Sequence, residues 1–257
     1  YRKKYIKYFN INKNKVKEKK VMLDTSPRVI LVQNVGLFTV GNNLNAAKIA
    51  GDLTETNARV ISSVEETSKY KFIPEKDLFD VEYWSLEQAK IKKTKKILQG
   101  NIVVITGSAG AIGSETYRLF KSYGAEVVLL DYILQKIKEM QSKTTDLCIH
   151  CDVTNKNSVK KAFKVICENF GGIDILISNA GTAIGGSIGE VNDKILRQSF
   201  EENFFSHQNC ASEAIKIMKE QNINGCLLFN ISTAIKPHLA KPANGRVPNN
   251  LQSSTKK

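Results

Sequence analysis

The chain has 257 residues, 42% of them hydrophobic, and a formal net charge of +13. This length can bury one large α/β core, or one domain and an appendage. The excess positive charge lies at the two ends, since residues 1–20 hold nine Lys or Arg and one acid, and residues 236–257 hold five Lys or Arg and no acid. The residues between them hold equal numbers of basic and acidic side chains. A charge confined to two tails argues against nucleic-acid binding as the function.

The first part of the chain predicts a tail and then a small α+β unit. Residues 1–22 are rich in lysine and carry few structural signals, so we expect a basic, flexible tail. Residues 28–32 and 37–40 are short β-like runs separated by a turn at residues 33–36. A helix is predicted over residues 43–68, because apolar residues recur there in steps of three and four, on a stripe that needs a partner: Ala46, Ile49, Ala50, Leu53, Val60, Ile61 and Val64.

A further helix is predicted before the chain enters a different pattern. Pro74 ends the first helical pattern, and residues 85–88 resemble a capping box that opens a helix through residue 96. We place a domain boundary after residue 97. The small unit then covers residues 23–97, and a larger domain covers residues 98–257 and becomes loop-like from about residue 236.

The clearest pattern of the chain lies at residues 101–113, NIVVITGSAGAIG. Its apolar, β-branched start indicates a strand that is buried on both faces of a parallel sheet. Glycines at 107, 110 and 113 then lead into a helix, whose first backbone N–H groups can bind a pyrophosphate that approaches closely. Gly107 would allow the tight turn, Gly110 the close approach, and Gly113 the packing of helix on strand.

A second strand, residues 126–131, ends in Asp131, 24 positions after Gly107. This is near the spacing at which a carboxylate binds the hydroxyls of an adenosine ribose. A carboxylate there would repel a 2′-phosphate, and the neighbouring Ser108 and Tyr132 supply no arginine to neutralise one. We therefore expect NAD rather than NADP.

Strands and helices continue to alternate after Asp131. Helices are predicted over residues 133–141, 159–170 and 192–219, the last interrupted near 201–203, and strands over residues 147–150, 174–178 and 226–231. This order implies a doubly wound parallel sheet of the α/β class, a Rossmann fold, with ligands at the carboxyl ends of the strands. Polar residues at those ends are predicted to converge on one crevice: Thr106, Asp131, Asp152, Asn179 and Ser232 or Thr233.

The five cysteines are Cys148, Cys151, Cys167, Cys210 and Cys226. Their odd number and mostly apolar surroundings are typical of reduced, buried thiols, so we predict a cytoplasmic protein. Cys148 and Cys151 have the spacing of a metal-binding pair, but a structural zinc needs four ligands and no second pair exists, so no metal site is predicted. No apolar run approaches the ~20 residues of a membrane span, and no hydrophobic segment follows the basic N-terminus as in a secretory signal.

The glycine turn, Asp131 and the strand-end residues resemble, in order and approximate spacing, the short-chain dehydrogenase/reductase family. The resemblance covers residues 98–235 and implies an NAD-dependent oxidoreductase. In such a protein Asp131 would bind the adenosine ribose, and Asp152 and Val153 would border the adenine. Asn179, Ala180 and Gly181 would line the cofactor behind the ribose and nicotinamide. The pyrophosphate would lie on the turn, whose residues are Gly107, Ser108, Gly110, Ala111, Ile112 and Gly113, with Ala111 where the family usually has glycine.

The resemblance also assigns catalytic roles. In the family's Asn-Ile-Ser-Ser pattern the second serine polarises the substrate oxygen, and residues 230–233, Asn-Ile-Ser-Thr, place Thr233 at that position. Ser232, which would point to the opposite face of a strand, is the fallback. Asn203 matches the helix asparagine of the family's water relay. The alternative for Asn203 is a residue that only interrupts the helix.

The acid/base tyrosine of the family has no counterpart in this sequence. No Tyr follows Tyr132, so the Tyr-x-x-x-Lys pair, which lowers the pKa of a phenol from about 10, is absent. Tyr117 and Tyr123 are predicted on the first helix, away from the hydride site. We expect a domain that is incomplete at its C-terminus, through truncation or a shifted reading frame. The alternative function is therefore a nucleotide-binding module without turnover, or an inactive fragment.

The N-terminal unit narrows the resemblance. Residues 28–41, the following helix and residues 74–90 resemble the end of a class II aldolase domain fused to a short-chain dehydrogenase, as in bifunctional rhamnulose-1-phosphate aldolase/alcohol dehydrogenases. Val35 stands where many class II aldolases have a zinc-binding His, so neither aldolase activity nor zinc is predicted. The implied function is NAD-dependent conversion of a small, lactaldehyde-like alcohol or aldehyde in deoxysugar breakdown. The implied partners are this small substrate and, as in the family, further copies of the chain in a homo-oligomer.

Overall fold

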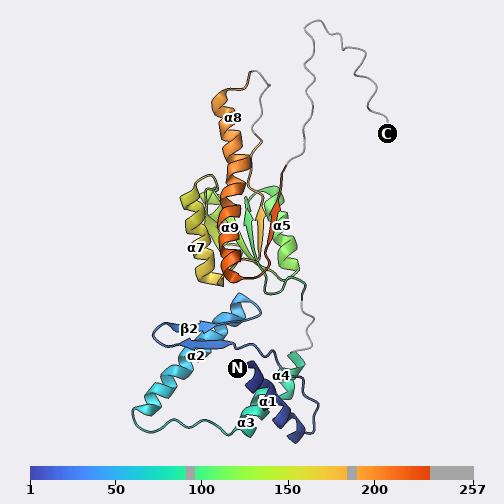
Figure 1. The fold of residues 1–257 in the computed structure, drawn as a ribbon, viewed down its shortest axis with the longest axis vertical. Helices are drawn as coiled ribbons and strands as arrows, with labels where there is room; N and C mark the ends of the chain where they lie inside the picture. The colour runs from blue at the N-terminus through green and yellow to red at the C-terminus, as the bar shows by residue number, and fades with distance from the viewer. Residues whose placement is uncertain (91–95, 184–189, 232–257) are drawn as a thin grey trace, which may run out of the picture.

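The computed structural model describes residues 1–90, 96–183 and 190–231, which form a small N-terminal unit and a larger α/β domain (Figure 1). The elements of the N-terminal unit are α1 (Arg2–Asn12), a 3₁₀ turn (Lys13–Lys15), β1 (Val29–Val32), β2 (Gly36–Thr39), α2 (Leu44–Glu65), α3 (Glu75–Glu82) and α4 (Ser85–Lys90). The elements of the α/β domain are β3 (Ile102–Thr106), α5 (Ala111–Ser122), β4 (Glu126–Asp131), α6 (Leu134–Gln141), β5 (Cys148–His150), α7 (Lys156–Phe170), β6 (Ile175–Ser178), α8 (Asp193–Phe200), a π-helical turn (Glu201–Phe205), α9 (Ser206–Gln221) and β7 (Cys226–Phe229).

The described strands of the α/β domain form one parallel sheet in the order β5-β4-β3-β6-β7. In chain order, the sheet begins with β3 at its centre and continues through β4 to β5 at one edge. The chain then crosses to the other side of β3 and adds β6 and β7. The predicted doubly wound sheet, a Rossmann fold, is therefore confirmed. Its switch point, where such folds bind ligands, lies between β3 and β6.

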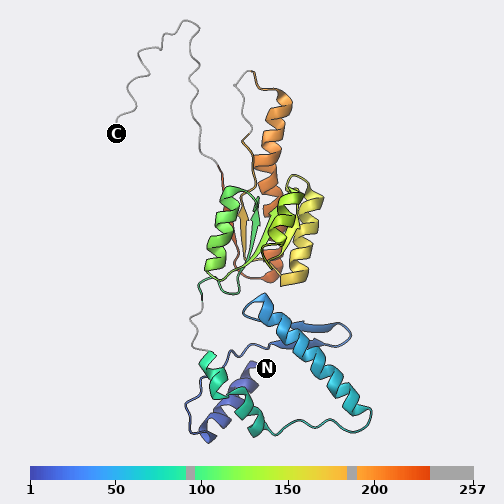
Figure 2. The same cartoon turned by 180° about the vertical axis from the view of Figure 1, so that it is seen from behind.

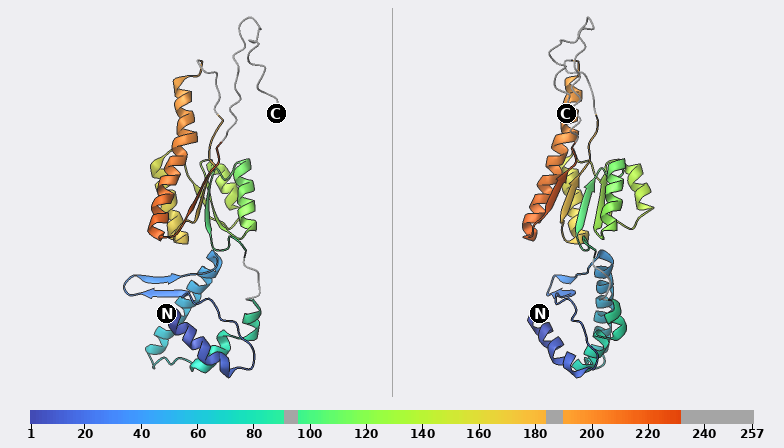
Figure 3. Two further views of the ribbon diagram at one scale, coloured as in Figure 1. Left: turned by 45° about the vertical axis from the view of Figure 1, so that its right-hand side comes forward. Right: turned by 90° about the vertical axis from the view of Figure 1, so that its right-hand side faces the viewer.

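Helices cover both faces of this sheet (Figure 3). Alternate strand residues point to opposite faces: Val103 and Val127 pack toward α5 and α6, whereas Val104 and Val128 pack toward α7 and α9. All four are fully buried. Burial on both faces is the physical reason why these strands are apolar at every position rather than at every second one.

The predicted flexible tail over residues 1–22 is wrong for its first half, which forms the helix α1. Phe9 is 6% exposed and packs against Phe79 of α3 and Tyr83, the C-cap residue of α3, with ring centroids 6.1 Å and 5.1 Å apart. The Oη atom of Tyr5 donates a hydrogen bond of 2.6 Å to Glu82. The apolar residues of α1 do recur at helical spacing, but the lysines between them hide that stripe in a composition-based analysis.

The hairpin β1–β2 and the helix α2 follow the sequence-based expectation. The two strands are antiparallel, and α2 lies across the hairpin when the molecule is seen from behind (Figure 2). Asn43 caps α2 by accepting a hydrogen bond of 2.7 Å from the N–H of Ala46. No residue of α2 is buried within the described part of the chain. The predicted helix through residue 96 is described only to Lys90, and residues 91–95 lie outside the described ranges.

Within residues 1–90, 96–183 and 190–231, no helix has both the length and the mean hydropathy needed to cross a membrane. The same described residues contain no group of three or more His, Cys, Asp or Glu side chains arranged to hold a metal ion. The five cysteines are free thiols.

Candidate functional site

A crevice of about 640 Å³ opens at the carboxyl ends of the parallel strands, beside the switch point of the sheet. It extends from the turn between β3 and α5, past the loop after β5, to the π-helical turn before α9. Its described lining combines small residues with polar side chains and two carboxylates: Gly107, Gly110, Ala111, Ile112, Gly113, Tyr132, Asp152, Val153, Thr154, Asn179, Ala180, Gly181, Thr182, Gln198, Glu202 and Asn230.

The glycine turn has the geometry that the sequence predicts for two of its glycines. Gly107 has a φ of 63°, in the left-handed region that favours glycine, and a Cβ there would lie 2.9 Å from Cα of Ala180. A Cβ at Gly113 would collide with the carbonyl oxygen of Gly107. The predicted tight turn and close packing are therefore confirmed.

Gly110 is the N-cap residue of α5 and has no side chain that could cap the helix. The first N–H groups of an α-helix have no acceptor inside the helix. Those of α5 therefore remain available at the crevice, together with the positive end of the helix dipole. This arrangement can bind a phosphate group.

The strand ends beneath the crevice are joined by an amide and hydroxyl network. Oγ1 of Thr106 accepts hydrogen bonds of 2.9 Å from the N–H groups of both Asn179 and Ala180. Nδ2 of Asn179 donates in return to the carbonyl oxygen of Thr106, at 3.0 Å. Nδ2 of Asn230 donates to Oδ1 of Asn179 at 2.8 Å. These bonds join the ends of β3, β6 and β7 at the floor of the crevice.

Asp131 lies behind the glycine turn and is 7% exposed. One carboxylate oxygen accepts a hydrogen bond of 3.0 Å from the N–H of Ala109, and the other accepts one of 3.0 Å from the N–H of Ile133. A carboxylate offers about four lone-pair sites, so both oxygens can still accept bonds from a ligand hydroxyl. Asp131 thus couples the conformation of the turn to the end of β4.

The loop after β5 forms a second wall of the crevice. Oδ1 of Asp152 accepts hydrogen bonds from N–H and Oγ1 of Thr154, at 2.9 Å and 2.7 Å. Oγ of Ser158 accepts a bond of 3.1 Å from the N–H of Asp152, and Asn155 caps α7. The loop is therefore tied to the first turn of α7.

The third wall comes from the π-helical turn, which lies where the sequence predicts an interruption of the long helix. Oδ1 of Asn203 accepts a hydrogen bond of 3.0 Å from the N–H of Thr182, and its Nδ2 donates to the carbonyl oxygen of Ser199 at 3.0 Å. A Cβ at Gly181 would lie 2.8 Å from Oδ1 of Asn203. A side chain at this position would require Asn203 to shift. Glu202, which accepts hydrogen bonds from Thr182 and Gln198, faces the crevice.

The structure therefore brings the predicted cofactor residues into one crevice except for two, Ser108 and Asp131, of which Asp131 lies behind the glycine turn and does not line the crevice. Ser108 is fully buried and its Oγ donates to the carbonyl oxygen of Leu130, so this side chain supports the wall instead of lining it. Asn203 lies behind the loop at residues 181–182. The predicted catalytic residues Ser232 and Thr233 lie outside the described residues.

Sequence analysis missed several residues that line the crevice. Tyr132 and Thr182 follow predicted positions directly, so extending each motif by one residue would have found them. Gln198 and Glu202 are four residues apart on one helix, and Glu202 precedes Asn203. Their helical spacing is a signal that could have found them.

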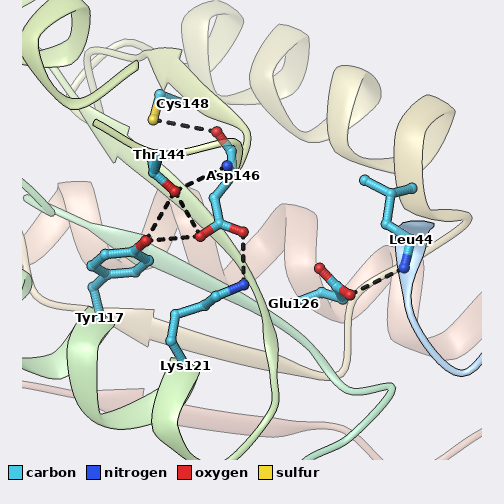
Figure 4. A network of polar contacts seen from close by, with 7 residues as sticks. All are labelled: Leu44, Tyr117, Lys121, Glu126, Thr144, Asp146 and Cys148. Atoms are coloured by element: carbon cyan, nitrogen blue, oxygen red, sulfur yellow. Dashed lines mark hydrogen bonds and ion pairs between the residues drawn. The ribbon is translucent and has the colours of Figure 1, made fainter. Parts of the chain in front are cut away.

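Tyr117 of α5 serves another part of the domain and does not line the crevice, as the sequence predicts. Figure 4 shows Tyr117 and Lys121 directed at the carboxylate of Asp146. Tyr117 Oη donates a bond of 2.8 Å to it, and Nζ of Lys121 forms an ion pair of 2.8 Å. Burial raises the pKa of Tyr117, so this phenol is a poor acid near neutrality. In the same view the Glu126 carboxylate accepts a hydrogen bond of 3.0 Å from the N–H of Leu44, which links the two parts of the chain (Figure 4).

Comparison with known proteins agrees with this division of the chain. Residues 101–246 match the model of the family described as short chain dehydrogenase, and residues 1–91 match that of the aldolase class II second domain. The predicted fusion of the two kinds of domain is therefore confirmed.

Individual relatives match part of their own length. The chain is 28% identical over 217 residues to an uncharacterized oxidoreductase, YuxG, of Bacillus subtilis, covering 81% of this chain and 32% of that protein. It is 34% identical over 149 residues to short chain aldehyde dehydrogenase 1 of Euphorbia lathyris, covering 55% and 51%. It is 35% identical over 143 residues to short-chain dehydrogenase reductase 3b of Arabidopsis thaliana, covering 54% and 56%. The chain spans about a third of the length of the Bacillus protein and about half that of the plant proteins.

Proposed function

Because the chain belongs to the short-chain dehydrogenase family, we propose that the crevice binds NAD and serves the interconversion of a small alcohol and its aldehyde. The observation that carries this proposal is the uncapped start of α5 beside the glycine turn, with the Asp131 carboxylate directly behind it. The residues present fit a dinucleotide, since side chains larger than hydrogen at Gly107 and Gly113 would disrupt the glycine turn.

We assign the residues roles that their places in and behind the crevice support. The N–H groups of Ala111, Ile112 and Gly113 would hold the pyrophosphate. Asp131 would accept hydrogen bonds from the adenosine ribose hydroxyls and, by its charge, disfavour a 2′-phosphate. Asp152 and Val153 would border the adenine.

The other end of the crevice would hold the reacting groups. Asn179, Ala180 and Gly181 would back the nicotinamide, whose chemistry when bound is to accept or donate a hydride. Thr233 would donate a hydrogen bond that polarises the substrate oxygen, with Ser232 as the alternative donor. Asn203 would position water for the proton that leaves with oxidation of the alcohol.

The substrate class rests on the N-terminal unit. Its match to an aldolase class II second domain supports a fused aldolase and dehydrogenase of deoxysugar breakdown, for which a lactaldehyde-like compound is the substrate that we propose.

A second candidate function is nucleotide binding without turnover. The observation that favours it is the absence of any Tyr after Tyr132 in the sequence. The tyrosine that does line the crevice is Tyr132, at the end of β4. That position lies beside Asp131, at the adenosine end.

Calorimetric titration with NAD and with NADP tests the first step. We expect NAD to bind more tightly than NADP, and Asp131→Asn to weaken NAD binding about tenfold. The assignment of Asp131 would be contradicted if the wild type bound NAD and NADP with equal affinity and Asp131→Asn did the same. Absorbance of reduced nicotinamide, followed with NADH and lactaldehyde, then separates the two candidates. Binding without any absorbance change would favour the module without turnover.

A further inference from the structure

Helix α9 carries a buried amide that reaches the adenine side of the crevice. Asn209 is 5% exposed. It belongs to α9, which lies beside α7 (Figure 1). Its Nδ2 donates hydrogen bonds to the carbonyl oxygens of Val153, at 3.1 Å, and Thr154, at 3.3 Å. Both of these residues line the crevice.

These two bonds join the loop after β5 to a helix that is distant in the sequence. The N–H of Cys151, at the start of the loop, also donates to the carbonyl oxygen of Asp131, whereas Ser158 and Asn155 belong to the first turn of α7 or its cap. Asn209 lies 55 residues further along the chain than Thr154. The carbonyl oxygens of two consecutive crevice residues therefore take their position from a different helix.

The oxygen atom of the Asn209 amide lowers the stability of the fold. Oδ1 of Asn209 is buried and accepts no hydrogen bond from the described residues. A buried acceptor without a donor destabilises a fold, whereas an apolar side chain of similar shape would not. Asn is thus a poor choice for packing alone at this position.

We propose that Asn209 is a positioning residue, which holds the Val153 and Thr154 carbonyls so that the loop presents its adenine-facing wall. This inference rests on the proposed function for the identity of the ligand, but the anchoring itself does not. A loop released from Asn209 would be free to close into, or withdraw from, the adenine space. Asn209→Leu would therefore weaken the adenine half of the site. Its effect on stability would be small, because the loss of the donor to two carbonyl oxygens opposes the gain from removing the unpaired Oδ1.

The test compares the wild type, Asn209→Leu and the matched control Asn169→Leu. Asn169 is exposed on α7, and its Nδ2 donates to Val165 within its own helix. Three measurements are made on each chain: thermal unfolding, calorimetric affinity for AMP and NAD, and amide hydrogen exchange at Thr154 and Asn155. The N–H groups of Thr154 and Asn155 both donate to Asp152 inside the loop.

For Asn209→Leu we expect faster exchange at Thr154 and Asn155, by about tenfold, with other amides unchanged. Affinity for AMP and for NAD should fall by the same factor, about fivefold to tenfold, because the adenosine half is common to both. The unfolding midpoint should change little, because the lost hydrogen bonds and the removed unpaired oxygen act on stability in opposite directions. Asn169→Leu should match the wild type in exchange and affinity.

Unchanged exchange at Thr154 and Asn155 in Asn209→Leu would overturn the proposal. So would a lower unfolding midpoint with unchanged AMP affinity, which is the result for a residue with a packing role only. If Asn209→Leu does not fold, Asn209→Ala carries the same measurements without added volume. If the wild type binds neither AMP nor NAD, the proposed function fails, and the exchange measurement still decides whether Asn209 anchors the loop.

Discussion

Oγ of Ser178 and Nδ1 of His207 lie 2.6 Å apart, and both side chains are buried. Ser178 ends β6 directly before Asn179, so this bond attaches the strand end under the crevice to α9. The ring of His207 also packs edge-on against Phe229 of β7, with centroids 5.9 Å apart. Burial lowers the pKa of His207 from its ordinary value of 6.5, so the folded chain favours the neutral ring.

This linkage makes stability depend on pH in a defined direction. The unfolded chain takes up a proton on His207 below about pH 6.5, which the folded chain resists, so the free energy of unfolding should decrease as the pH falls through this value. Above it the contribution is fully present. Urea unfolding of the wild type and His207→Gln between about pH 7.5 and pH 5.5 measures the difference. Parallel pH dependences of the two chains would contradict this prediction.

Gly113→Ala should disrupt the glycine turn, because its Cβ would meet the backbone of Gly107, which cannot rotate away. We expect a loss of about 1–3 kcal/mol in the free energy of unfolding, together with weaker NAD binding. Gly51→Ala is the control, since its Cβ would make an ordinary contact 3.5 Å from Thr39 and lies inside α2. That change should stabilise α2 by about 0.5–1 kcal/mol. Denaturant unfolding and calorimetry check both variants. Two variants of equal stability would refute the steric argument.

Thiol reactivity should follow burial. Burial raises the pKa of Cys151 to about 11 and that of Cys210 to about 12, so neither forms a thiolate near neutrality. Cys226 is exposed. Iodoacetamide at about pH 8 should therefore alkylate Cys226 first and leave Cys151 and Cys210 intact until the chain unfolds. Peptide mass spectrometry follows each site. Early labelling of Cys210 in the folded chain would show that the core opens locally.

Phe9→Ala should release α1 from the N-terminal unit. Removal of this buried ring from its contacts with Phe79 and Tyr83 should destabilise their packing by about 3 kcal/mol. Trypsin should then cleave the lysine-rich α1 faster, while residues 98–183 and 190–231 remain protected. Ile11→Ala, at a side chain that is 46% exposed, is the control. Timed digestion and mass spectrometry report the rate. Equal cleavage of the two variants would mean that α1 does not depend on the Phe9 contacts.

Local sequence patterns were sufficient to predict the glycine turn, the position of Asp131 and the alternation of strands and helices. Each depends on residue types at fixed spacing within one βαβ unit, where backbone geometry leaves few alternatives. Asn203 could be placed in a helix interruption for the same reason, and the π-helical turn lies there.

Other features depend on contacts between distant residues. The stripe of Tyr5, Tyr8 and Phe9 becomes the packed face of α1 only because Phe79 of α3 and its C-cap residue Tyr83 cover it. Glu202 becomes a crevice residue because the loop after β6 brings Thr182 to it. Asn209 contacts the loop after β5 because the sheet stacks α9 beside α7.

The sequence by itself thus determined the class of fold and the glycine turn at the start of α5, since local sterics and hydrophobic periodicity decide both. The tertiary structure alone decided which side chains face the crevice and which, like Ser108, lie behind it. The physical reason is that burial and long-range hydrogen bonds depend on how the elements pack together, and local spacing does not encode that packing.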